Sequence, residues 1–181
     1  MTYSSARPQT PTPSRSLRVL AVSALALSAF GLTGCSALAQ LLPGSQPVRD
    51  AETGEITERQ DNADVFELKV GDCTDTDETL VDEATSIPVV PCGDPHADEV
   101  YFSYDIESDE FPGEDAILGE AQERCVAEFA GFIGIDYMES ELEIWPMYPT
   151  QGSWSQGDRE VLCLVYDPAQ DTTGSLKGSA R

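Results

Sequence analysis

The chain has 181 residues, a length that suits one domain or one domain with tails. It carries 10 basic and 33 acidic residues, a net charge of −23 at pH 7. All 33 acids lie after position 35, where only 7 basic residues remain, so this part is near −26 (7 minus 33). Such a charge repels phosphates and excludes nucleic acid as a partner. We interpret it as a solvated acidic coat, with recruitment of cations or of a basic partner as the alternative.

The N-terminal segment has the layout of a secretory signal. It contains Arg7, Arg15 and Arg18 and no acid, and an apolar run follows over residues 17–32. That run is too short to span a bilayer comfortably. It ends in Leu-Thr-Gly-Cys at positions 32–35. The pattern predicts a signal peptide over residues 1–34.

The tetrapeptide at 32–35 resembles the lipobox of bacterial lipoproteins, in which cleavage precedes the cysteine. The resemblance implies a diacylglyceryl thioether on Cys35 and fatty acids such as palmitate. Two acyl chains hold a protein stably on a bilayer, whereas one anchors it only marginally. We therefore expect a lipid anchor in the cytoplasmic membrane, with the protein on its extracytoplasmic face. A cleaved signal that happens to end near a cysteine, or an uncleaved anchor, is the alternative.

The cysteine count agrees with export. Five cysteines would leave one stray thiol, but lipidation of Cys35 leaves four, an even set typical of disulfides in an exported chain. Four cysteines allow three connectivities, and sequence alone does not choose among them. We favour Cys73–Cys92, inside a stretch of strands, and Cys125–Cys163, between a helix and a strand. A zinc site is the weaker alternative, since the chain has no C-x-x-C pair and one histidine.

The chain after Cys35 divides into a tether and a domain. Residues 35–63 are polar, acidic and proline-containing, which predicts a flexible tether. We place the domain at 64–181, with strands over 65–70, 86–90 and 99–106, the last showing a clear period-two alternation.

One strong helix follows the Pro112-Gly113 pair. Its apolar stripe repeats every four residues, and Gly131 and Gly134 are expected to end it. An irregular edge strand near 142–146, a turn carrying Trp154, a strand over 161–166 and a short strand at Leu176 complete the prediction. The order predicts an α+β fold, a small and mainly antiparallel sheet with one long helix packed on it and two disulfides. The apolar stripe of the predicted helix consists of Ile117, Ala121, Cys125, Phe129 and Ile133.

Few residues suggest chemistry. His96 lies between Asp94 and Asp98 and is expected to cap a turn, with a base or ligand role as the alternative. Arg159 is expected to pair with an acid beside Trp154. The alternative is an Arg–Trp patch that grips a ligand. The acidic loops near 72–78 and 105–110 lack the glycine and terminal glutamate of an EF-hand, so we predict no metal and no cofactor.

Three ordered blocks carry a family resemblance. They are Val70-Gly71-Asp72-Cys73 with Val89-Val90-Pro91-Cys92 and Pro95-His96; Pro112-Gly113 with Cys125 and Phe129; and Trp154 with Gly157-Asp158-Arg159, Cys163 and the run 174–179. Together they resemble the septum-formation family of actinobacterial envelope proteins. The resemblance implies an extracytoplasmic role in the envelope, with envelope or division proteins as partners, and supplies no catalytic residue.

The sequence therefore predicts a non-catalytic interaction or adaptor module on a lipid anchor, linked to septum formation or cell division. A binding protein for a ligand or a divalent cation is the first alternative. A hydrolase centred on His96 is the second. The oligomeric state is not indicated.

Overall fold

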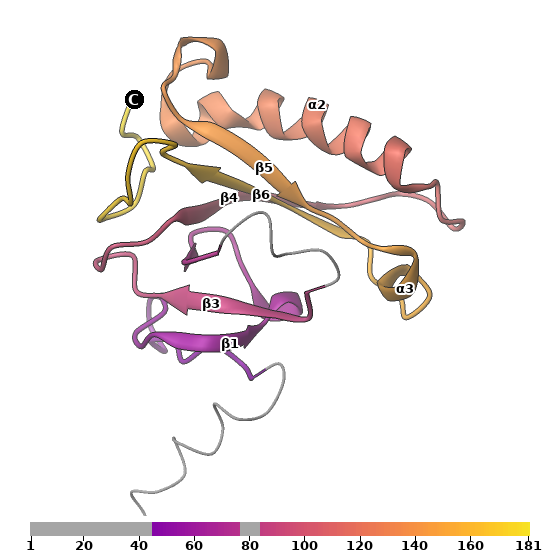
Figure 1. Ribbon diagram of the computed structural model, residues 1–181, viewed down its shortest axis with the longest axis horizontal. Helices are drawn as coiled ribbons and strands as arrows, with labels where there is room; N and C mark the ends of the chain where they lie inside the picture. The colour runs from indigo at the N-terminus through magenta and orange to yellow at the C-terminus, as the bar shows by residue number, and fades with distance from the viewer. Residues whose placement is uncertain (1–44, 77–83) are drawn as a thin grey trace, which may run out of the picture. The chain divides into compact units, whose positions relative to one another are not determined.

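The computed structural model describes residues 45–76 and 84–181. Its centre is a six-stranded antiparallel sheet in the order β1-β3-β2-β4-β6-β5. One long helix, α2 (Glu114–Ile133), packs on β4, β5 and β6 (Figure 1). The α+β fold with one long helix and two disulfides is confirmed. The strands are β1 (Gln60–Asp64), β2 (Cys73–Thr74), β3 (Ser86–Val90), β4 (Asp98–Asp105), β5 (Glu143–Met147) and β6 (Glu160–Tyr166).

The helix follows its sequence pattern closely. All five residues of the four-residue stripe are buried, while Leu118 on its flank is 40% exposed. Gly113 precedes the first turn, and Gly134 ends the helix at φ +101°, a left-handed conformation that glycine adopts without a Cβ clash. Glu120 and Arg124 form an ion pair on the exposed face at 3.2 Å.

Strand β6 contributes side chains to apolar clusters on both faces of the sheet. It lies between β4 and β5, and its residues alternate between the two faces. Val161, Cys163 and Val165 face the helix, whereas Leu162 and Leu164 join the apolar cluster on the opposite face. Because both faces are covered, the strand is apolar throughout rather than alternating. That second cluster also contains Ile56, Ala63, Val65, Leu68, Ile87, Val89, Val100 and Trp145.

The predicted strand over 65–70 is wrong. Residues Val65–Glu67 form a 3-10 helix, η1, and Asp64 caps it by accepting a hydrogen bond from the Phe66 amide at 3.0 Å. Val65 and Leu68 are buried, while Phe66 is 54% exposed. A burial spacing of three residues matches a 3-10 turn and not a strand.

The fold begins earlier than the boundary expected at residue 64. From residue 45 onward, where the structure describes it, the expected tether packs on the domain. Ile56, Gln60 and Ala63 are buried, and β1 pairs with β3. Gln60 takes the place of an apolar residue because its side chain binds backbone, accepting from the Val48 amide and donating to the Gln46 carbonyl.

The later elements agree in part with the prediction. β5 is an edge strand containing Pro146, as expected for a residue that lacks an amide hydrogen. Trp154 ends a short helix, α3 (Gln151–Trp154), where a turn was predicted. Leu176 is buried but lies in no strand. A second 3-10 helix, η3 (Tyr137–Glu139), follows α2.

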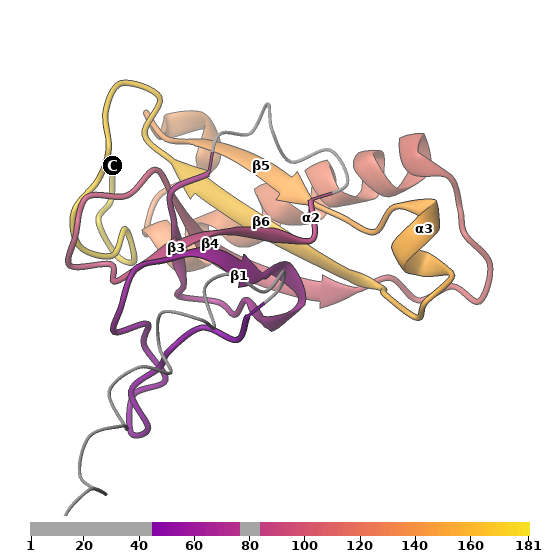
Figure 2. The same ribbon diagram turned by 60° about the horizontal axis from the view of Figure 1, so that its bottom comes forward.

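Residues 167–181, here called the C-terminal segment, lie along the sheet end and the loop between β3 and β4 (Figure 2). His96 and Thr172 exchange two backbone hydrogen bonds of 3.0 and 2.9 Å. The Gly174 amide donates to the Cys92 carbonyl at 2.6 Å, and the Ala180 amide donates to the end of α2. The segment is thus held by the backbone over most of its length.

Candidate functional site

Both favoured disulfides are present. Cys73–Cys92 joins β2 to the second residue after the end of β3, with 5.2 Å between the Cα atoms. Cys125–Cys163 joins α2 to β6, with 5.6 Å between the Cα atoms. The pairing left open by the cysteine count is therefore settled as predicted. Cys35 lies outside the described residues.

His96 has the structural role that was expected of it. Its side chain is fully buried, and both ring nitrogens are engaged. Nδ1 lies 2.8 Å from the Asp94 carbonyl oxygen, and Nε2 lies 2.9 Å from the Thr172 hydroxyl. The ring therefore ties the β3–β4 loop to the C-terminal segment, and it offers no exposed nitrogen to a substrate.

Trp154 and Arg159 are brought together, although not as expected. The guanidinium carbon of Arg159 lies 3.7 Å from the centroid of the Trp154 ring, and Nη1 donates to the Trp154 carbonyl at 2.9 Å. Within residues 45–76 and 84–181, Arg159 has no acidic partner within 4.0 Å. The expected acid is thus replaced by the indole face. Trp154 is 6% exposed, which leaves little of its ring for a ligand.

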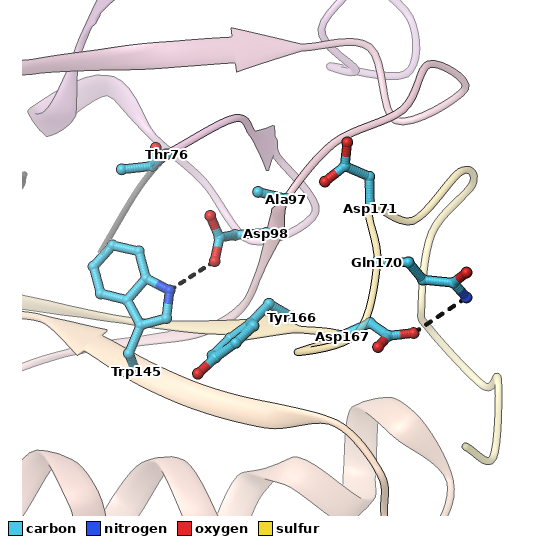
Figure 3. Close-up of a pocket in the computed structure, with 8 residues that line it drawn as sticks. All are labelled: Thr76, Ala97, Asp98, Trp145, Tyr166, Asp167, Gln170 and Asp171. Atoms are coloured by element: carbon cyan, nitrogen blue, oxygen red, sulfur yellow. Dashed lines mark hydrogen bonds between the residues drawn. The ribbon is translucent and has the colours of Figure 1, made fainter. Parts of the chain in front are cut away.

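A cavity of about 210 Å³ opens where β4 begins and β6 ends (Figure 3). Two aromatic side chains, Trp145 from β5 and Tyr166 from β6, line one side of it. Three carboxylates, Asp98, Asp167 and Asp171, line it as well. The remaining lining residues are Thr76, Ala97 and Gln170. We call this set the acidic pocket.

Asp98 is the most buried carboxylate of the acidic pocket, at 3% exposure. The indole nitrogen of Trp145 donates to its Oδ1 at 2.7 Å, as Figure 3 shows, and the Thr74 hydroxyl donates to Oδ2 at 3.4 Å. A buried carboxylate requires such donors because burial removes its hydration. These bonds fix the indole plane beside the carboxylate.

The other side of the acidic pocket belongs to the C-terminal segment. Asp167 accepts from the Ala169 amide at 2.8 Å and from Arg181 at 2.5 Å. The hydrogen bond from the Ala169 amide, and to a smaller extent the one from the Arg181 guanidinium, holds the pKa of Asp167 below its usual range. Asp171 is exposed, and its carboxylate stands near the pocket rim in Figure 3. Thr76 adds a buried hydroxyl oxygen with no hydrogen-bond partner among the described residues.

The acidic loops do not assemble a cation site in the described part of the chain. Asp72 is buried and binds Arg49, and Asp75 binds Arg59. Where the structure describes the chain, one group of three potential metal ligands comes within 4.8 Å of one another, namely Cys73, Cys92 and Glu99. Two of these are joined in a disulfide.

Sequence reasoning did not find the acidic pocket, since its residues run from Thr76 to Asp171 and form no motif. The sequence placed Asp98 only as a neighbour of His96, and it placed Trp145 only within the irregular edge strand near 142–146. The one available signal was the presence of Asp167 and Asp171 after the strand predicted at 161–166. Their part in a pocket can be inferred only when the strand order is known.

Comparison with known proteins identifies the family. A family model described as "Septum formation" matches residues 52–181. No curated protein and no solved structure matches the chain. No helix in the described residues is both long and apolar enough to cross a membrane. Since the family model covers well over half of the 181 residues and includes the sheet, the helix and both disulfides, the chain belongs to the septum-formation family.

Proposed function

We propose that this protein is an exported bacterial lipoprotein whose domain is a non-catalytic docking module for a basic partner in the cell envelope. The acidic pocket is the observation that carries the docking role. The family supports an envelope role linked to septum formation. The basic and apolar N-terminus with Cys35 supports export and lipid anchoring on the extracytoplasmic face of the cytoplasmic membrane.

The dimensions of the acidic pocket suit one side chain. Ligand pockets commonly span about 300–1,000 Å³, and this cavity of about 210 Å³ is smaller. A lysine or arginine carries an apolar stem and a charged head. Trp145 and Tyr166 offer apolar surface to the stem, and Asp98 and Asp171 offer charge to the head. The Thr76 hydroxyl offers one further hydrogen bond.

The charge distribution supports the same partner. Four of the five arginines in the described part form ion pairs inside the domain, and the fifth, Arg159, stacks on Trp154. Most acids in the described part therefore have no arginine as an ion-pair partner. Association with a basic partner is accelerated by such a field and weakened by salt.

The environment of His96 favours this role over a hydrolase. Its ring is fully buried between Asp94 and Thr172, and His96 is not among the residues that line the acidic pocket. A general base must reach the proton that it removes.

Charge reversal at the rim of the acidic pocket tests the docking role. Asp171→Arg is expected to lower the yield of a basic partner captured from native membrane extract about tenfold or more. Glu123→Arg makes the same charge change on the exposed face of α2 and is the matched control. Equal losses in the two variants would indicate a general field effect, and full capture by Asp171→Arg would refute pocket docking.

Replacement of the lipidation residue tests the anchor. Cys35→Ser is expected to abolish incorporation of a labelled fatty acid and to move the protein out of the membrane fraction or leave its signal uncleaved. The wild-type protein treated in parallel is the control. An intact mass showing residues 1–34 on the native protein, or a free thiol at position 35, contradicts lipidation.

A further inference from the structure

The two disulfides differ in access. Cys125 and Cys163 are both fully buried in the cluster between α2 and the sheet. Cys73 is fully buried as well. Cys92 is partly exposed, whereas the other three cysteines of the two disulfides are buried. Thiol–disulfide exchange begins with attack on an accessible sulfur.

The surroundings of Cys92 leave that approach open. Its Sγ lies 3.4 Å from the Gly71 carbonyl oxygen. Gly71 and Gly93 flank the bond, and both are exposed. A Cβ atom placed on either glycine would meet nothing within 4 Å. Gly71 also has φ +95°, which disfavours any larger residue at that position.

A carboxyl group stands on the buried side of the same disulfide. A carboxylate oxygen of Glu99, in β4, lies within 4.8 Å of both Sγ atoms. The Glu99 side chain is 1% exposed. It accepts hydrogen bonds of 2.6 Å from the Ser175 hydroxyl and from the Leu176 amide.

Burial raises the pKa of the Glu99 carboxyl, and this effect exceeds the opposing effects of its two hydrogen bonds and of nearby His96 and Lys177. A larger share of the carboxyl is therefore protonated than in an exposed glutamate. A carboxyl is a common general acid and base.

We propose that Cys73–Cys92 is a thiol–disulfide exchange site, entered at Cys92 by an external thiolate, with Glu99 as the proton donor and acceptor for Cys73. Cys125–Cys163 is the inert, structural disulfide. The site takes thiols as a chemical class, and the proposal does not depend on the acidic pocket.

With a thiol reductant, the external thiolate sulfur forms a bond to Cys92 Sγ while the Cys73–Cys92 bond breaks, and the electron pair of that bond leaves on Cys73 Sγ. Cys73 then takes the carboxyl proton of Glu99. A second external thiolate attacks the external sulfur of the mixed disulfide and expels the Cys92 thiolate, which takes a proton from solvent. Two external thiols are thereby oxidised to one disulfide, and the protein disulfide is reduced to two thiols. Reclosure starts from the mixed disulfide: the Glu99 carboxylate accepts the Cys73 proton, and the Cys73 thiolate attacks Cys92 Sγ and expels the external thiolate.

The wild-type protein tests the site without any substitution. Folded protein is treated with dithiothreitol, quenched with an alkylating reagent and mapped by peptide mass spectrometry. We expect Cys73–Cys92 to be reduced at least tenfold faster than Cys125–Cys163 while the near-ultraviolet dichroism is retained. A glutathione adduct is expected on Cys92 and not on Cys73. Equal reduction rates, or an adduct on Cys73, would overturn the assignment.

A substitution tests the role of Glu99. Glu99→Gln keeps a side chain that can bond Ser175 and Leu176, and it removes the titratable proton. Reclosure of the Cys92–glutathione adduct at pH 7 is expected to slow about tenfold or more, and its pH profile should follow the Cys73 thiol alone. Glu139→Gln, an exposed site, is the control and should reclose at the wild-type rate. An unchanged rate and pH profile in folded Glu99→Gln would show that Glu99 is merely structural.

Discussion

Removal of the Cys125–Cys163 disulfide by the double change Cys125→Ala and Cys163→Ala is expected to destabilise the domain by about 4 kcal/mol. The bond closes a loop with a sequence separation of 38, which sets the entropy that it removes from the unfolded chain. Both sulfurs are fully buried in the cluster of Phe129 and Tyr101, so alanine also leaves unfilled space. Urea unfolding followed by circular dichroism, with tryptophan fluorescence as a second probe, measures the loss.

The other disulfide provides the comparison. Cys73→Ala with Cys92→Ala removes a link with a sequence separation of 19 and should destabilise by about 3 kcal/mol. Its Cys92 end is partly exposed, so less space is left behind. A loss below about 1 kcal/mol for the buried pair, at an unchanged denaturant slope, would mean that the α2–β6 link contributes little to stability.

The sequence predicted the parts of the fold that depend on apolar periodicity. The stripe on α2 is set by burial of one helix face, so it could be read without knowing the partner element. The alternation over residues 99–106 located β4, but burial does not alternate along the strand. Its first four residues are all buried, and its register shifts between Val100 and Phe102. The disulfide pairing was favoured on the expected elements but was not fixed by the sequence, since four cysteines allow three connectivities. The structure contains Cys73–Cys92 and Cys125–Cys163, and the second forms because α2 packs on the sheet.

The N-terminal strand could not be predicted in the same way. β1 reads Gln-Asp-Asn-Ala-Asp, a polar sequence typical of a linker. It forms because it is an edge strand, with Ala63 buried and Gln60 bonded to backbone. Its apolar neighbours in the cluster include Ile87 and Val89 of β3, which are distant in the sequence. Pairing over long distances decides such a segment, and composition does not.

The acidic pocket escaped prediction for a related reason. Asp98 and Trp145 are 47 residues apart, and their hydrogen bond arises because β6 lies between β4 and β5. Glu99 is hidden in a similar way, since the sequence places an acid in a strand that otherwise predicts one buried apolar face. Only the strand order places that carboxyl against the Cys73–Cys92 disulfide and the C-terminal segment.

Asp72→Ala is expected to destabilise the domain by about 3 kcal/mol, because it leaves the partly buried Arg49 without its counter-charge. The two guanidinium nitrogens of Arg49 bind the two carboxylate oxygens of Asp72 at 2.6 Å each. The side chains are 15% and 4% exposed, and Arg49 also donates to the carbonyls of Gly54 and Glu67. If residue 49 lay in a flexible tether, Asp72→Ala would cause almost no loss of stability. Urea unfolding of this variant therefore decides whether the segment around Arg49 unfolds together with the domain.

Two further variants separate the ion pair from general charge effects. Asp61→Ala removes an acid that pairs with Arg59 while 83% exposed, and it should change stability by less than about 0.5 kcal/mol. Replacing both partners, as Arg49→Met with Asp72→Ala, should recover part of the loss, since no unpaired charge is then buried. If Asp72→Ala and Asp61→Ala lose equally little, then Arg49 is solvated in solution and the first fifteen described residues do not stabilise the sheet.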